Sequence, residues 1–252
     1  MSPSLPSVSV ILPVHNGERF IAGAIQNIQS QQYHPLEIIV VDDGSTDSTP
    51  EILAQFKSDI QCIQQLQAGP SAARNRGIKA AQGEVIAFLD VDDLWPDNML
   101  LTWATYLAEH PDVDIVQGLI QRMQMVSPGK SDGPIEFEPV FDPYPFINIG
   151  SALYRRSVYE KIGLYDEALW DNEDTDWFTR AWENNILKVL LPEVMLFYRK
   201  HDRNMTLEQK DLVFFGLIKI YKRHLDRLRS EPALATRRSP MSWADYLGKT
   251  PD

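Results

Sequence analysis

The chain has 252 residues, 44% of them hydrophobic, with 24 Lys and Arg against 35 Asp and Glu and a formal net charge of −11. This length and composition predict a packed core rather than disorder, in one α/β domain with additions or in two small domains. The acidic balance argues against a nucleic-acid partner, because each phosphate contact requires a cation.

The single cysteine argues against a disulfide-stabilised protein, and the apolar runs argue against a signal peptide and a membrane-spanning helix. Cys62 cannot form an intramolecular disulfide, and its setting in IQCIQ predicts a buried thiol. The sequence begins without the basic region and the long apolar stretch of a signal peptide. No run approaches the roughly 18 apolar residues of a spanning helix, so we expect a cytoplasmic protein with no transmembrane segment.

The first half of the chain alternates apolar strands with amphipathic helices. Strands are predicted over residues 8–14, 36–41, 60–65, 84–90 and 113–120, with helices within 18–30, 48–56, 68–81 and 96–110. This alternation predicts an α/β fold with a mostly parallel sheet and helices on both faces. Ligands of such sheets bind at the carboxyl ends of the strands, where three polar clusters would converge, at residues 13–16, 42–43 and 90–93.

The pattern changes after about residue 125. A turn-rich break at 127–134 predicts a hairpin or a loop, and residues 172–185 predict a helix with Trp177 and Phe178 on its apolar side. Two short strands are predicted over 187–191 and 194–199, and then a long helix over 207–228 and a loose tail from Ser230. No linker is long enough to indicate two independent domains, so we expect a single domain over 1–252.

Three carboxylates, Asp90, Asp92 and Asp93, lie at or just after the end of the predicted strand VIAFLD. Asp90 and Asp92 would face one side of the strand end, roughly 6.6 Å apart along the chain, and their hard oxygen ligands suit Mn²⁺ or Mg²⁺. Asp93 or Asp97 can instead start the next helix, and this is the favoured interpretation of Asp97. Haloacid-dehalogenase-type phosphohydrolases also place Asp-x-Asp after an apolar strand, but usually with Thr next and on an early strand. Here Leu94 follows and three strands come before, so that alternative is weaker.

Four segments, in this order and spacing, resemble family-2 glycosyltransferases. They are VSVILPVHN, IIVVDDGSTDST, GPSAARNRGIKAAQGEVIAFLDVDD and NEDTDWFTRA, which cover the chain between residues 8 and 182, with YRKHDRNMT as a weaker continuation to residue 206. The resemblance implies the Rossmann-like A-type fold of nucleotide-diphospho-sugar transferases. It divides the chain into a nucleotide-sugar-binding half (8–125), an acceptor and catalytic-base half (126–206), a C-terminal helix (207–229) and a tail (230–252).

The same resemblance implies a reaction and its cofactor. The expected activity is metal-dependent, inverting transfer of a sugar from a nucleoside diphosphate, expected to be UDP, to a hydroxyl acceptor in polysaccharide, glycolipid or cell-envelope glycan synthesis. The acceptor would be a sugar, a lipid-linked glycan or a protein. By position, Asp92 is the direct metal ligand, and Asp90 contacts the ribose or a metal-bound water. His201 would lie near the metal or the diphosphate, where a structural role is the equal alternative.

Further residues are assigned to the donor by the resemblance. Asp43, with Asp42 beside it, would accept the N3–H of uracil, and a plain Asp-Gly turn is the alternative. Arg74 lies near a predicted helix N-terminus, where amides and a guanidinium group suit a diphosphate. The donor residues assigned in this way are Pro13, Val14, Asp42, Asp43, Arg74 and Asn75.

Three carboxylates in NEDTDW compete for the role of catalytic base. Inverting transfer needs one carboxylate to take the proton of the acceptor hydroxyl. Helical spacing places Asp174 at the head of the apolar stripe and points Asp176 away from it. The family pattern, an acidic residue and Asp with Arg six residues later, fits Asp174 and Arg180. We therefore predict Asp174 as the base, with Glu173 and Arg180 binding substrate, and interpret Asp171 and Asp176 as charges that complement the helix dipole.

Two questions stay open from the sequence. The long C-terminal helix fits core packing, which we favour, but also a homodimer contact or a basic amphipathic face against anionic lipid. The second question is whether the chain catalyses at all, since a catalytically idle subunit that binds sugar nucleotides or supports an assembly would share the donor segments. Intact Asp92 and Asp174 favour the enzyme.

Overall fold

A computed structural model of the chain describes residues 4–127, 135–169, 172–202, 204, 210–230 and 246. Apart from Ser127, the turn-rich segment expected at 127–134 lies outside these ranges, as do Asp171 and most of the predicted tail. Within the described ranges, no helix is long and apolar enough to cross a membrane.

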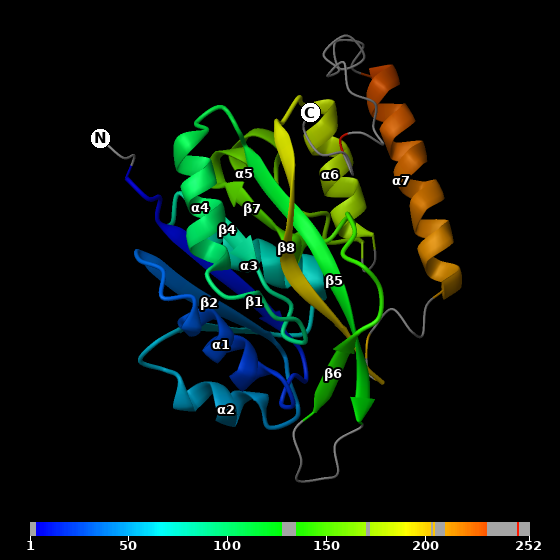
Figure 1. Ribbon diagram of the computed structural model, residues 1–252. Helices are drawn as coiled ribbons and strands as arrows, with labels where there is room; N and C mark the ends of the chain where they lie inside the picture. Colours follow the sequence, from blue (N-terminus) through cyan, green and yellow to red (C-terminus); the bar gives the residue numbers. More distant parts are fainter. Residues whose placement is uncertain are drawn as a thin grey trace.

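The described strands form one eight-stranded sheet in the order β3-β2-β1-β4-β7-β5-β6, with β8 paired to β5 beside this path (Figure 1). Its first half is parallel and consists of β1 (Val8–Val14), β2 (Leu36–Asp43), β3 (Gln61–Gln65) and β4 (Val85–Phe88). Its second half is mixed and consists of β7 (Ala152–Arg155), β5 (Ile115–Ser127), β6 (Glu136–Pro139) and β8 (Lys188–Lys200). The α/β class and the mostly parallel sheet are confirmed, and β5 crosses the boundary expected near residue 125.

Helices cover both faces of this sheet. One core lies under α1 (Ile21–Ser30) and α4 (Met99–Glu109), and the other under α3 (Pro70–Ala80), α5 (Arg156–Ile162) and α6 (Glu173–Glu183). Successive residues of β1 point to opposite faces of the sheet and so pack into the two cores in turn, as the two-residue period of a strand requires. The remaining elements are α2 (Thr49–Gln55), the 3₁₀ turn η1 (Ile149–Ser151) and α7 (Lys210–Ser230), which lies outside α6 (Figure 1).

Three local predictions are wrong. The strands expected over 187–191 and 194–199 form one strand, β8, because shifts in its register with β5 absorb the interruption at Pro192. Cys62 is exposed rather than buried, because β3 is the edge strand of the sheet. Neither Asp93 nor Asp97 caps the following helix, which begins only at Met99 after Asn98 in a left-handed conformation (φ 57°).

A buried lysine connects β8 to the end of the chain. Lys188 is 6% exposed, donates a hydrogen bond to Gln117 Oε1 at 2.8 Å, and has its Nζ 5.3 and 5.1 Å from the ring centroids of Phe178 and Tyr246. Tyr246 is itself buried, so the tail is not loose at this residue. Burial lowers the pKa of Lys188 to about 7.

Lys188→Met is expected to raise the melting temperature more at pH 6 than at pH 9. Because the folded-state pKa of Lys188 is about 7, the native chain buries a positive charge at pH 6. Above this pH the native chain loses the proton before the unfolded chain does, so the free energy of unfolding rises with pH until the unfolded chain also loses this proton near pH ~10. Thermal denaturation at both pH values measures the difference, with Lys79→Met at an exposed position of α3 as control. An equal gain at both pH values would contradict this expectation.

Candidate active site

The polar clusters predicted from the sequence meet at the carboxyl edge of the parallel strands. Val14, the last residue of β1, is in register with Asp42 of β2, and Asp90 follows the end of β4 by two residues. Pro13 is partly buried and Val14 fully buried, so the end of β1 presents mainly backbone groups at this edge.

The guanidinium group of Arg74 connects this edge to α6. It lies 2.8 Å from Asp90 and 2.5 Å from Glu173, and only 7% of the Arg74 side chain is exposed. Desolvation alone would lower the pKa of Arg74, but the charges of Asp90 and Glu173 outweigh it and raise that pKa, so the cation persists. This ion-pair bridge, Asp90–Arg74–Glu173, is called the Arg74 bridge below.

The next two carboxylates are held by the end of β8. Asp92 Oδ2 accepts a hydrogen bond from Asn204 Nδ2 at 3.0 Å and lies 3.1 Å from His201 Nε2. Asp93 is 1% exposed and accepts the backbone N–H of Arg199 at 2.8 Å. Burial, together with the charges of the neighbouring carboxylates, raises the pKa of Asp93 well above its ordinary value. Through its hydrogen bond with Arg199, Asp93 anchors the loop that contains Asp92 and Asp93 to β8.

The predicted metal ligands fit an ion only in combination with other oxygen donors. Asp92 and His201 are in contact, whereas Asp90 directs one oxygen to Arg74. In the described part of the chain, no three carboxylate, His or Cys groups converge closely enough to hold an ion alone. Mg²⁺ sites commonly combine one or two protein carboxylates with waters and substrate phosphate oxygens, and a site of that kind suits this donor set.

The carboxylate of Asp43 organises the loop that enters α3. Its Oδ1 accepts from Gln65 Nε2 at 2.7 Å and from the N–H of Ala68 at 2.8 Å, and its Oδ2 accepts from the N–H of Gly69 at 2.8 Å. The Oδ1 of Asp42 accepts the backbone N–H of Ser45 at 2.9 Å and so closes the turn at the end of β2. Both side chains are buried, so the structural interpretation of this pair has direct support.

The side chain of Asn75, which is predicted to line the donor pocket, is used for hydrogen bonds within the protein. Its amide donates to the carbonyl of Tyr165 and to Glu167 Oε1, both at 2.9 Å, and its oxygen accepts the N–H of Tyr165 at 2.9 Å. With 2% exposure, Asn75 fixes the segment before α6 onto α3.

The predicted base lies beside the Arg74 bridge. Asp174 follows Glu173 in the first turn of α6, and its Oδ1 accepts the N–H of Thr175 at 2.6 Å. Burial, and then the charge of Glu173, raises the pKa of Asp174 to about 7. A carboxylate with a pKa near the operating pH is suited to accept a proton.

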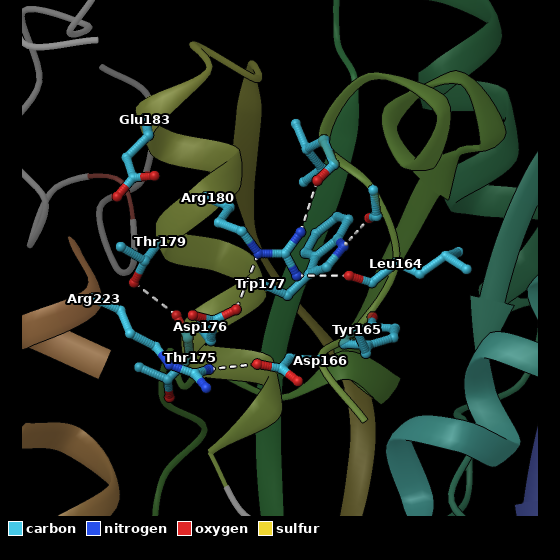
Figure 2. Close-up of polar contacts among 12 residues, drawn as sticks. Leu164, Tyr165, Asp166, Thr175, Asp176, Trp177, Thr179, Arg180, Glu183 and Arg223 are labelled. Atoms are coloured by element: carbon cyan, nitrogen blue, oxygen red, sulfur yellow. Dashed lines mark hydrogen bonds and ion pairs between the residues drawn. The ribbon is translucent and has the colours of Figure 1, made fainter. Parts of the chain in front are cut away.

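Asp176 and Arg180 contact each other on one side of α6 (Figure 2). Asp176 lies in the first turn of α6, as expected for a charge that complements the helix dipole. Asp176 is 3% exposed, because α7 covers it, and it accepts from Arg180 Nε at 3.0 Å. The two other nitrogens of Arg180 donate to the carbonyls of Ile162 and Leu164, both at 2.7 Å. The Arg180 guanidinium is therefore used within the protein and is not brought to Asp174.

Comparison with known proteins places this arrangement in a family. Residues 9–163 match the family model described as Glycosyl transferase family 2. The chain belongs to this family. The match includes the strand-end carboxylates and Arg74, whereas Glu173 and Asp174 lie beyond its last residue.

Curated relatives of this family-2 chain include a teichoic acid biosynthesis protein, and the relatives described here are longer than the chain. The minor teichoic acid biosynthesis protein GgaA of Bacillus subtilis is 27% identical over 79% of the chain, which covers 48% of GgaA. An uncharacterised glycosyltransferase of the same organism, EpsJ, is 32% identical over 80% of the chain, which covers 63% of EpsJ. The chain thus spans between about half and two thirds of these relatives.

Solved structures share its fold. A structure of residues 1–349 of Staphylococcus aureus TarS in complex with UDP-GlcNAc has a TM-score of 0.67 and 20% identity, covering 95% of this chain and 69% of that one. A mannosyltransferase from Pyrobaculum calidifontis in complex with GDP-Man and Mn²⁺ has a TM-score of 0.62 and 19% identity, covering 94% of this chain and 67% of that one. At this identity the likeness establishes the fold.

Three residues of this family-2 site were missed from the sequence. Arg199 and Asn204 hold the Asp92–Asp93 loop, and Gln65 holds Asp43. Arg199 and Asn204 flank His201 within YRKHDRN, so the only available signal was their proximity to a residue already singled out. Gln65 lies in a run of polar residues that gives no such signal.

Asp43→Asn is expected to destabilise the fold by about 1–3 kcal/mol, because the amide loses charge-assisted acceptance from two backbone N–H groups in a buried position. Urea unfolding measures the change, with Asp59→Asn at an exposed position as control. Unchanged stability with an altered nucleotide preference would instead indicate that Asp43 serves only base recognition.

Proposed function

We propose that this family-2 chain transfers a sugar from a nucleoside-diphosphate sugar to a hydroxyl acceptor, with inversion at the anomeric carbon and with a divalent ion. UDP is the expected nucleotide. The observation that carries this function is the Arg74 bridge, which joins a strand-end carboxylate on the donor side to Glu173, next to a carboxylate whose pKa is raised. One connected cluster therefore contains groups suited to a diphosphate and a group suited to an acceptor proton.

On the donor side, Asp92 and His201 would hold Mn²⁺ or Mg²⁺, with Asp90 nearby. A bound ion supplies charge neutralisation for the leaving diphosphate. The chain carries a formal charge of −11, so local cations or an ion are needed to hold an anionic donor. The complexes of TarS with UDP-GlcNAc and of the mannosyltransferase with GDP-Man and Mn²⁺ support this choice of ligands.

On the acceptor side, Asp174 is proposed as the general base. The acceptor oxygen attacks the anomeric carbon, and the bond from that carbon to the diphosphate oxygen breaks. The electron pair of the broken bond leaves with the nucleoside diphosphate, and the hydroxyl proton passes to Asp174. Attack on the face opposite the leaving group inverts the configuration in one step, with no covalent intermediate on the protein.

The proposed acceptor is a hydroxyl group of a cell-envelope glycan, glycolipid or polysaccharide. The relative GgaA, which is named as a minor teichoic acid biosynthesis protein, supports this class of acceptor. A panel of UDP and GDP sugars, screened by thermal shift with and without Mn²⁺, tests the donor first. Failure of every nucleotide sugar to stabilise the chain would contradict the proposal.

A catalytically idle binding subunit is the second candidate function. It would keep nucleotide binding through the donor edge but would have no use for a carboxylate of raised pKa beside the Arg74 bridge. Turnover measurements separate the two, because an idle subunit binds the donor and releases no free nucleotide under any condition.

Asp92→Asn is expected to abolish the Mn²⁺-dependent part of donor binding while the fold remains intact. The amide retains the size of the side chain and can still contact His201 and Asn204, but it lacks the negative charge that an ion requires. Calorimetric titration of UDP with and without Mn²⁺ measures the effect, and Asp97→Asn, at an exposed position, is the matched control. An unchanged response to Mn²⁺ would rule out Asp92 as a metal ligand.

Asp174→Asn is expected to reduce turnover by about 10²–10⁴-fold, the usual contribution of a general base. In the parent protein kcat should rise with pH through about 7 as Asp174 loses its proton, and this rise should disappear in the variant. Because the folded state favours the protonated form of Asp174, the free energy of unfolding of the parent protein falls as pH rises through about 7. The variant should therefore melt at no lower a temperature than the parent at pH 8.

Asp112→Asn is the control, since this carboxylate is exposed and distant in sequence from the cluster. Donor hydrolysis by water reports the reaction where the acceptor is unknown. Wild-type turnover in Asp174→Asn would reassign the base, with Glu173 as the next candidate. Lost donor binding would make Asp174 a donor-binding residue instead.

A further inference from the structure

Among the side chains of α7 that the structure describes, His224 and Arg227 attach this helix to α6 through ion pairs. Arg227 donates to both oxygens of Glu183 at 2.8 and 3.1 Å, and His224 Nδ1 lies 2.5 Å from the same carboxylate. Arg227 also lies 3.7 Å from Asp176 Oδ1. These four residues, Asp176, Glu183, His224 and Arg227, are called the α6–α7 clamp. The C-terminal helix thus packs on the domain, as favoured from its sequence.

Both carboxylates of the α6–α7 clamp are buried, with 4% of the Asp176 side chain and 1% of the Glu183 side chain exposed. Burying a carboxylate is unfavourable unless a cation and hydrogen bonds compensate for the lost water. Asp176 Oδ2 accepts from Arg180, whereas its Oδ1 makes no hydrogen bond within the described residues and has Arg227 as its ion-pair partner. Each oxygen of Asp176 therefore has a guanidinium partner, Arg180 on α6 for one and Arg227 on α7 for the other.

Arg180 connects α6 to the segment that precedes it (Figure 2). It holds the carbonyls of Ile162 and Leu164, and Trp177 Nε1 donates to the carbonyl of the glycine between them at 3.1 Å. The next residue, Tyr165, is fixed onto α3 by Asn75, which is adjacent in sequence to Arg74. Helix α6 is thus attached to α3 through this segment and to α7 through the clamp.

We propose that the α6–α7 clamp positions Asp174 for proton transfer and that Arg227 is a positioning residue for the reaction. This inference rests on the proposed role of Asp174 as base. Asp176 and Asp174 belong to the same turn of α6, so a displacement of the clamp moves the base relative to the donor groups on the sheet. A misplacement of about 1 Å can reduce a rate by about 10²-fold.

The contact between the two helices contains a surface hollow of about 560 Å³, whose charged lining consists of Asp166, Asp176, Arg180, Arg223, Asp226 and Arg227. Three acidic and three basic groups line this hollow, and Arg223 lies 2.5 Å from Asp166. Mutual neutralisation of this kind fits an attachment between helices better than a site for a charged ligand.

The test compares turnover with donor affinity. Arg227→Gln leaves Glu183 buried with only His224 beside it, so the double variant Glu183→Gln/Arg227→Gln, which removes both charges at similar size, is the main variant to measure. We expect the folded double variant to lose about 10–10²-fold in kcat, with KM for the donor changed by less than about twofold. Hydrogen exchange in the first turn of α6 should become faster, while exchange in β1 and β4 should not change.

Two variants complete the design. Arg227→Lys keeps the charge and should restore part of kcat, whereas Arg229→Gln, on the same helix with 78% of its side chain exposed, should behave as wild type. Unchanged kcat in the folded double variant, an equal loss in Arg229→Gln, or a raised KM at unchanged kcat would each overturn the proposal. Wild-type turnover in Asp174→Asn would remove the base itself, and so the two failures are distinguishable.

Discussion

The buried guanidinium group of Arg74 is the interaction on which the rest of the site depends. It neutralises one carboxylate just after the end of β4 and one at the start of α6, two elements that are far apart in the sequence. Its planar fork fixes the direction of both contacts, which a lysine would not do. Because removal of a buried partner typically costs about 3–5 kcal/mol, this cation constrains how α6 docks as well as the local charge.

Helix α6 is attached by arginines along its whole length. Arg74 contacts its first residue, Arg180 ties its middle to the segment 162–164, and Arg227 contacts its last residue. These cations are paired with carboxylates in a protein with a formal charge of −11, so they are used for internal structure rather than displayed to solvent. This distribution explains why an anionic donor would depend on a divalent ion and on a small number of local donors.

The two halves of the sheet contribute different parts of the site. The parallel strands β1, β2 and β4 bring polar residues to one edge because their carboxyl ends coincide. The mixed half returns β8 to that edge, where Arg199 and Asn204 hold the Asp92–Asp93 loop. A continuous sheet through β7 and β5 keeps the two contributions rigid with respect to each other.

The sequence by itself determined the alternation of strands and helices, the carboxyl edge and the family, because these follow from local periodicity and from motifs that are contiguous in the chain. Only the tertiary structure decided what each polar side chain contacts. Asn75 and Arg180 lie in motifs assigned to substrate, yet each of them donates hydrogen bonds to backbone carbonyls more than fifteen positions away. Helical spacing predicted that Asp176 points away from the apolar stripe of α6, but it could not show that α7 packs over this side and brings Arg227 to Asp176. Burial by a distant segment depends on packing between elements, and that is the information that a local pattern does not contain.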